Sequence, residues 1–111
     1  HEKLVRRLER YARANPIARP AAALWQGLLL RDRGRPQRAL GPLRRALAQA
    51  QRMEMQYDEA EAHEAIGRLR LDPSPAGAPL LLTTRAAREH IARARDLYLR
   101  MGLTQRAESL P

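Results

Sequence analysis

The sequence contains no cysteine, which excludes a disulfide framework, a zinc–thiolate site and a cysteine nucleophile. It also contains no phenylalanine, and aromatic residues make up only 4 % of the 111 residues. Valine occurs once and isoleucine three times, so the residues that favour β-sheets are scarce. Hydrophobic residues nevertheless reach 44 %, and their core must consist mainly of alanine and leucine, which favour helices. We therefore expect an all-α fold, in one helical domain over residues 1–111.

Long apolar runs are absent as well. The longest apolar stretch, residues 21–30, is interrupted by Gln26 and has half of the about 20 residues that a bilayer-spanning helix needs. We interpret it as a buried helix and predict no membrane span. No signal peptide is visible, and the chain begins at His1 rather than at a methionine. We therefore expect a cytoplasmic segment from inside a longer protein.

The net charge of +9 is unevenly distributed. Residues 1–50 carry twelve basic and three acidic residues, whereas residues 51–111 carry nine of each. One interpretation is an electropositive surface in the first half for an acidic partner, nucleic acid or anionic lipid. The other is a GC-rich genome that encodes basic residues as arginine, because 20 of the 21 basic residues are arginine.

Apolar residues at spacings of three and four predict about five helices and a last helical turn. Their expected ranges are 3–14, 19–33, 36–53, 58–71 and 85–101, with the last turn at 104–110. Asp58 is a candidate N-cap for the fourth helix, and Thr83 or Thr84 for the fifth. Pro42 falls inside the third helix, where we expect it to bend the helix or to delay its start.

Each predicted helix has an apolar stripe that we expect to face the core. In the first helix this stripe is Leu4, Leu8 and Tyr11, with Val5 beside it. In the later helices the inward residues are expected to be Ala39, Leu43, Ala46, Leu47, Ala50, Ala62, Ile66, Leu69, Ala87, Ile91, Ala94, Leu97 and either Tyr98 or Met101. Residues 72–79 contain three prolines and a glycine and predict a loop inserted between the fourth and fifth helices.

The third and fifth helices are similar at an offset of 48 residues, and the helices before them at an offset of 40. The matched pairs are Ala39 with Ala87, Leu43 with Ile91, Ala46 with Ala94, and Gly27 with Gly67. A glycine in one helix, followed in the next by alanine, a large apolar residue and alanine, resembles the tetratricopeptide repeat. The resemblance covers residues 20–103. It implies antiparallel helical hairpins stacked as a short right-handed solenoid.

The sequence departs from the tetratricopeptide pattern in three respects. Its period is longer than the usual 34 residues. The proline that often closes the second helix is absent after Ala50 and Ala94, and the family's aromatic residue is displaced to the neighbourhood of Trp25. The long helices and the link at residues 52–60 resemble the divergent repeats of MalT-like regulators, signalling ATPases and class III nucleotide cyclases. This resemblance implies a signalling or regulatory parent protein. It does not imply ATPase or cyclase activity for this segment.

The resemblance also implies a partner-binding concave face lined by the first helix of each hairpin. The residues that it places there are Leu24, Leu28, Arg31, Asp32, Glu61, Glu64, Arg68 and Leu71. The expected function is protein–protein interaction or scaffolding, with a protein, a peptide or another domain of the same parent as partner. A purely structural packing segment stays open as an alternative, as does a simple four- or five-helix bundle.

A basic patch favours nucleic acid as a competing partner. Arg31, Arg33, Arg35 and Arg38 cluster around one predicted turn and could hold phosphates. The tryptophan and the three tyrosines are not interleaved with this cluster, as a stacking platform for bases would require.

No motif predicts an enzyme, a metal site or a cofactor. His63 does not belong to a His-Glu-x-x-His motif, and His63 and His90 are expected at the surface or its boundary. No glycine-rich loop ends in the Lys-Ser/Thr pair of a phosphate-binding loop. Ser74 and Ser109, the only serines, fall in a predicted loop and near the terminus. We therefore expect a non-enzymatic chain without metal or cofactor.

Overall fold

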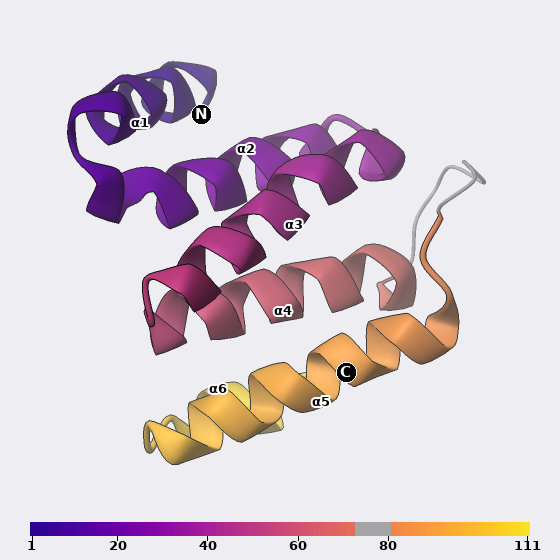
Figure 1. Ribbon diagram of the computed structural model, residues 1–111. Coiled ribbons are helices and arrows are strands. Elements are labelled where there is room, and N and C mark those ends of the chain that lie inside the picture. Colours follow the sequence, from indigo (N-terminus) through magenta and orange to yellow (C-terminus); the bar gives the residue numbers. More distant parts are fainter. Residues whose placement is uncertain (73–80) are drawn as a thin grey trace.

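The computed structural model describes residues 1–72 and 81–111, and these segments form helices without a strand. The elements are α1 (Glu2–Ala14), a short 3₁₀ helix η1 (Pro16–Ala18), α2 (Arg19–Asp32), α3 (Pro36–Arg52), α4 (Gln56–Leu71), α5 (Thr84–Arg100) and α6 (Thr104–Glu108). The expected all-α class is thereby confirmed. Figure 1 shows α1 at one end of the molecule, α3 between α2 and α4, and α6 beside α5 at the other end.

Three helices end in the same way. After α2, α3 and α5 the chain enters the left-handed region at Gly34, Glu54 and Gly102, with φ values of 73°, 54° and 75°. In each turn the amide of the following residue donates to the carbonyl five positions earlier, at 2.8–2.9 Å. This Schellman arrangement satisfies carbonyls at the helix end and reverses the chain. The same local device therefore starts α3, α4 and α6.

The predicted helix starts are correct for α5 and wrong for α4. Thr83 caps α5, because its Oγ1 accepts a hydrogen bond from the Ala86 amide at 3.0 Å. Asp58 does not cap α4, which begins two residues earlier at Gln56 without a side-chain cap. Asp58 instead lies in the first turn, where a negative charge is favoured by the helix dipole. Helix α3 begins at Pro36 and continues through Pro42, which is buried.

Two helical hairpins, α2/α3 and α4/α5, depend on a glycine at their closest approach. A Cβ atom placed on Gly27 would lie 2.5 Å from Cδ2 of Leu43, and one placed on Gly67 would lie 2.6 Å from Cδ1 of Ile91. These distances are too short for any larger residue without movement. Both hairpins therefore have the same contact between a glycine and a large apolar residue. These are residues that match between the two hairpins in the sequence.

The hydrophobic core has two connected parts. One part is formed by α2, α3, α4 and the start of α5, and the other by α4, α5 and α6. The stripes predicted for α3, α4 and α5 are confirmed, because their members are buried except for the partly buried Leu47 and Met101. Tyr98 is the largest fully buried side chain among the described residues.

The stripe predicted for α1 is wrong at Leu4 and Tyr11, while Leu8 is half-buried and Val5 is buried. Val5 and Ala12 are the buried residues of this helix, whereas Leu4 and Tyr11 are 64 % and 57 % exposed. Both sets are spaced for a helix face, and α2 packs against the Val5–Ala12 side. The Leu4–Tyr11 side therefore remains in contact with solvent.

The predicted loop at 72–79 begins at Asp72, and its other residues lie outside the described part of the chain. Leu82, which follows this segment, is buried in the core and joins α5 to the first hairpin. Within residues 1–72 and 81–111, no helix is both long and apolar enough to cross a membrane.

Candidate functional site

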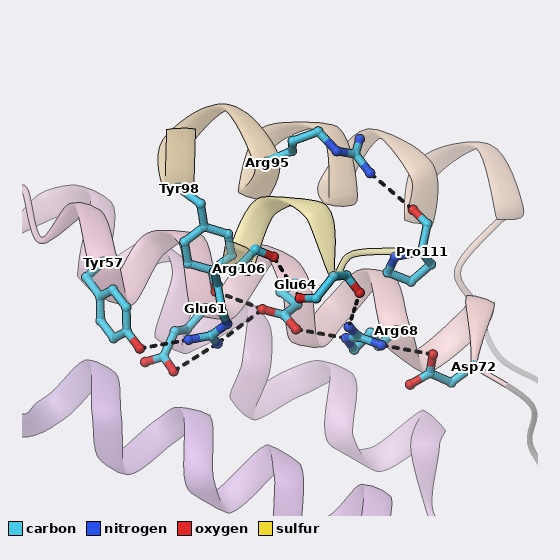
Figure 2. Close-up of polar contacts among 10 residues, drawn as sticks. Tyr57, Glu61, Glu64, Arg68, Asp72, Arg95, Tyr98, Arg106 and Pro111 are labelled. Carbon is cyan, nitrogen blue, oxygen red and sulfur yellow. Dashed lines mark hydrogen bonds and ion pairs between the residues drawn. The ribbon is translucent and has the colours of Figure 1, made fainter. Parts of the chain in front are cut away.

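The α4 half of the predicted partner-binding face lies under α6. Figure 2 shows Glu61, Glu64 and Arg68 along one side of α4, with Arg106 of α6 reaching over them. Their side chains are 28 %, 13 % and 26 % exposed. Leu71 is also partly covered, since it packs against both parts of the core. These four predicted residues are therefore engaged within the chain.

Arg106 is the centre of this polar cluster. Its guanidinium lies 4.8 Å from the ring centroid of Tyr98 and 5.8 Å from that of Tyr57. It donates hydrogen bonds to the Tyr57 hydroxyl at 2.9 Å and to Glu64 Oε1 at 3.2 Å. A further ion pair joins it to Glu61 at 3.5 Å. Cation–π contacts and charge-assisted hydrogen bonds thus fix α6 on α4.

Glu64 joins α4 to α5 through its carboxylate. The Tyr98 hydroxyl donates to Glu64 Oε1 at 2.7 Å, and Arg68 Nε donates to Oε2 at 2.8 Å. Burial acts to raise the pKa of Glu64, but the hydrogen bonds from Tyr98 and Arg68 and the charge of Arg106 outweigh it, so this pKa lies below its usual value. The carboxylate is therefore held in its charged form.

Arg68 completes the cluster by tying α4 to the end of the chain. It contacts Asp72 at 3.3 Å and donates to the Ser109 carbonyl at 3.2 Å. In Figure 2 a second tie of the same kind runs from Arg95 of α5 to the carbonyl of Pro111, at 3.3 Å. Sequence patterns do not indicate the role of Arg106, because its hydrogen-bond partners Tyr57 and Glu64 lie more than forty residues earlier in the chain.

The α2 half of the predicted face is partly inside the core. Leu24 is only 6 % exposed, and Leu28 packs against the same core cluster while partly exposed. Arg31 and Asp32 pair with each other at 2.8 Å on the surface. On the surface of α2, Leu28 and the Arg31–Asp32 ion pair are therefore accessible to a partner, whereas Leu24 is not.

The predicted basic patch is partly neutralised. Arg31 pairs with Asp32, and Arg33 pairs with Glu2 of α1 at 2.6 Å. Arg35 and Arg38 are exposed and form no ion pair within the described residues. The turn between α2 and α3 thus presents two free cations rather than four.

An apolar groove that the sequence did not indicate lies between α1 and α2. It has a volume of about 340 Å³ and is lined by His1, Leu4, Val5, Leu8 and Trp25. Trp25, the only tryptophan, is 50 % exposed. An exposed apolar patch of contiguous large side chains is typical of an interaction surface.

The two internal histidines meet between α4 and α5. His63 and His90 have their Nδ1 atoms 2.9 Å apart, so one ring donates and the other accepts. His63 is 4 % exposed, which makes the prediction of a surface position wrong for this residue. Burial, then the neighbouring His90 and Arg93, lower the pKa of His63 from 6.5 to about 4. His63 is therefore neutral at pH 7.

No group of three or more metal-ligating side chains occurs in the part of the chain that the structure describes. No protein-family model, curated protein or solved structure matches the chain. Among the described residues, the α1–α2 groove offers a surface whose lining is apolar apart from His1.

Proposed function

We propose that this chain is a protein-interaction or scaffolding module, built from tetratricopeptide-like hairpins within a larger signalling or regulatory protein. The observation that carries the proposal is the exposed apolar groove of α1 and α2, where Leu4 and Trp25 are at least half exposed. Large apolar side chains favour burial against a partner at about 25 cal/mol per Å². A polar rim around such a patch is the usual anatomy of a protein interface.

The matching glycine contacts support the repeat part of the proposal. Gly27 with Leu43, and Gly67 with Ile91, bring each pair of helices together in the same way. In helical arrays such hairpins stack and present an extended surface to a partner. The right-handed solenoid and its concave face belong to this proposal. Within that face, Leu28 and Leu71 are the apolar residues that remain partly exposed.

Nucleic-acid binding is the second candidate, favoured by the free cations Arg35 and Arg38. Two carboxylates, Asp32 and Glu2, offset the other two arginines of the patch. This weakens the patch as a phosphate-binding surface.

A selection from a displayed library of random helical peptides, with the chain immobilised, tests the proposal. We expect enriched peptides whose binding changes little between about 0.05 and 0.2 M salt, because apolar contact dominates. The binding of each enriched peptide is compared with that of a random oligonucleotide. Enrichment of no peptide would favour a structural packing segment. Oligonucleotide binding that is tighter, and that falls steeply with salt, would favour the nucleic-acid alternative.

A further inference from the structure

We infer that the α1–α2 groove binds an acidic amphipathic helix of a separate partner protein. This inference rests on the proposed interaction function and specifies the partner's chemistry. The groove residues that carry it are Leu4, Leu8 and Trp25, with Tyr11 continuing the apolar stripe of α1.

The spacing of the exposed stripe favours a helical occupant. Leu4, Leu8 and Tyr11 are separated by four and three residues, the pattern with which a helix contacts another helix. Helix α1 already uses Val5 and Ala12 to pack against α2. The stripe, in which Leu4 and Tyr11 are exposed and Leu8 is half-buried, is thus a second packing face on the same helix. An amphipathic helix laid along a groove would bury it through residues at its own i, i+3 and i+4 positions.

Charge on α1 favours an acidic partner. Lys3, Arg7 and Arg10 each precede a member of the stripe by one position and are exposed beside it. Of the two acidic residues of α1, Glu2 is paired with Arg33, which leaves Glu9. Glutamate or aspartate beside the apolar residues of the occupant would meet these cations across the rim.

The same charges disfavour a second copy of this chain as the occupant. A symmetric dimer would bring α1 against itself. The five basic residues of each α1 would then face like charges, which costs binding energy at an interface. The net charge of +9 acts in the same direction.

Trp25 provides a direct reading of binding, because it is the only tryptophan and lines the groove. The probe is a capped helical peptide of about 15 residues, long enough to cover α1, with leucine in one stripe and glutamate on both flanks. We expect saturable binding with a blue shift of Trp25 emission. The control peptide has lysine in place of every glutamate and should bind at least about tenfold more weakly.

Variants of α1 locate the site on the protein. Leu4→Asp and Arg7→Glu should each weaken binding of the acidic peptide by about tenfold or more, and Arg7→Glu should improve binding of the lysine peptide. Leu99→Asp is the matched control, since Leu99 is 49 % exposed on the distant α5. It should leave binding unchanged. Circular dichroism of each variant checks that the helices are retained.

Three results would overturn the inference. Equal binding of the acidic and lysine peptides would contradict the charge argument. Loss of binding in Leu99→Asp but not in Leu4→Asp would place the peptide elsewhere, and would leave the broader interaction function standing. Dimerisation of the chain alone, abolished by Leu4→Asp in sedimentation velocity, would show that a second copy fills the groove.

Discussion

Glu54 has a backbone conformation that glycine adopts in the two turns of the same kind. Its φ of 54° matches those of Gly34 and Gly102, and an L-residue with a Cβ atom is strained in that region. The position is exposed, and its side chain forms no ion pair within the described residues. The turn between α3 and α4 is therefore the least favourable of the three.

We expect Glu54→Gly to raise the free energy of unfolding by about 1 kcal/mol, because glycine removes the left-handed strain. Gly102→Ala is the reverse test and should lower it by about the same amount. Urea denaturation measures both. A lower stability for Glu54→Gly would mean that glutamate compensates for its strain through a contact.

Replacing glycine by alanine should destabilise the fold by different amounts at Gly27 and at Gly67. A new Cβ atom at either position meets a large side chain at 2.5–2.6 Å. The nearest backbone carbonyl is closer at Gly67, where the Ala87 oxygen lies at 2.9 Å, than at Gly27, where the Ala39 oxygen lies at 3.3 Å. A side chain can rotate, whereas a backbone carbonyl moves only with its helix. We expect Gly67→Ala to lower the free energy of unfolding by about 2 kcal/mol, and Gly27→Ala by less.

A double-mutant cycle tests the origin of that cost. Ile91→Ala removes the side-chain atoms nearest to Gly67. The pair Gly67→Ala/Ile91→Ala should lose about 1 kcal/mol less than the sum of the single variants. Strict additivity would show that the predicted clash with Ile91 does not limit the hairpin.

The contact between buried His63 and half-buried His90 predicts a dependence of stability on pH. The pKa of His63 is lowered from 6.5 to about 4 by burial, and burial followed by Arg44 and Arg93 also lowers the pKa of His90. As the pH falls below 6.5 the unfolded chain binds protons that the folded chain excludes. Stability is therefore complete above pH 6.5 and falls between pH 6.5 and about 4.

Between pH 7 and pH 5, His63 should account for a loss of about 2 kcal/mol in the free energy of unfolding. His63→Gln keeps a hydrogen-bonding side chain but cannot titrate, so this part of the loss should disappear. Urea denaturation at both pH values gives the comparison. An identical pH dependence in the variant would contradict a neutral, buried His63.

At the scale of elements, the sequence predicts the helices that are buried on one side and fails where a helix has two apolar faces. Residues such as Leu43 and Ile91 lie on unambiguous stripes, and both are at most 2 % exposed. In α1, Leu4 and Val5 are neighbours on different faces, and only the position of α2 decides which is buried. Periodicity alone cannot distinguish two such faces.

The sequence also could not predict how α6 is held. Its five residues are too few to form a stable helix alone, so its position depends on tertiary contacts. Those contacts join Arg106 to Tyr57 and Glu64, which are 49 and 42 residues away. The expectation that Glu61, Glu64 and Arg68 form a partner surface did not include their cover by Arg106 of α6.

We expect Arg106→Ala to lower the free energy of unfolding by about 2 kcal/mol and to remove the hydrogen-exchange protection of α6. The loss follows from the charged hydrogen bonds to Tyr57 and Glu64 and the contact with Tyr98. Arg95→Ala is the control, since its hydrogen bond to Pro111 is exposed. Equal protection of α6 in both variants would show that Arg106 does not fasten it.

At the scale of the whole molecule, charge and apolar surface concentrate at the same end. The excess of positive charge lies in residues 1–50, and so do Leu4, Tyr11 and Trp25, three of the most exposed large apolar side chains. The second hairpin, in contrast, is closed by α6 and by the Arg106 cluster. An interaction partner is therefore expected at the α1–α2 end.

The most direct test of this account is an amide NMR titration of the chain with two ligands of equal negative charge, an acidic helical peptide and a random oligonucleotide, at about 0.15 M salt. We predict that the peptide binds more tightly and shifts the amides of α1 and the indole N–H of Trp25. Tighter binding of the oligonucleotide, with shifts centred on Arg35 and Arg38, would contradict it.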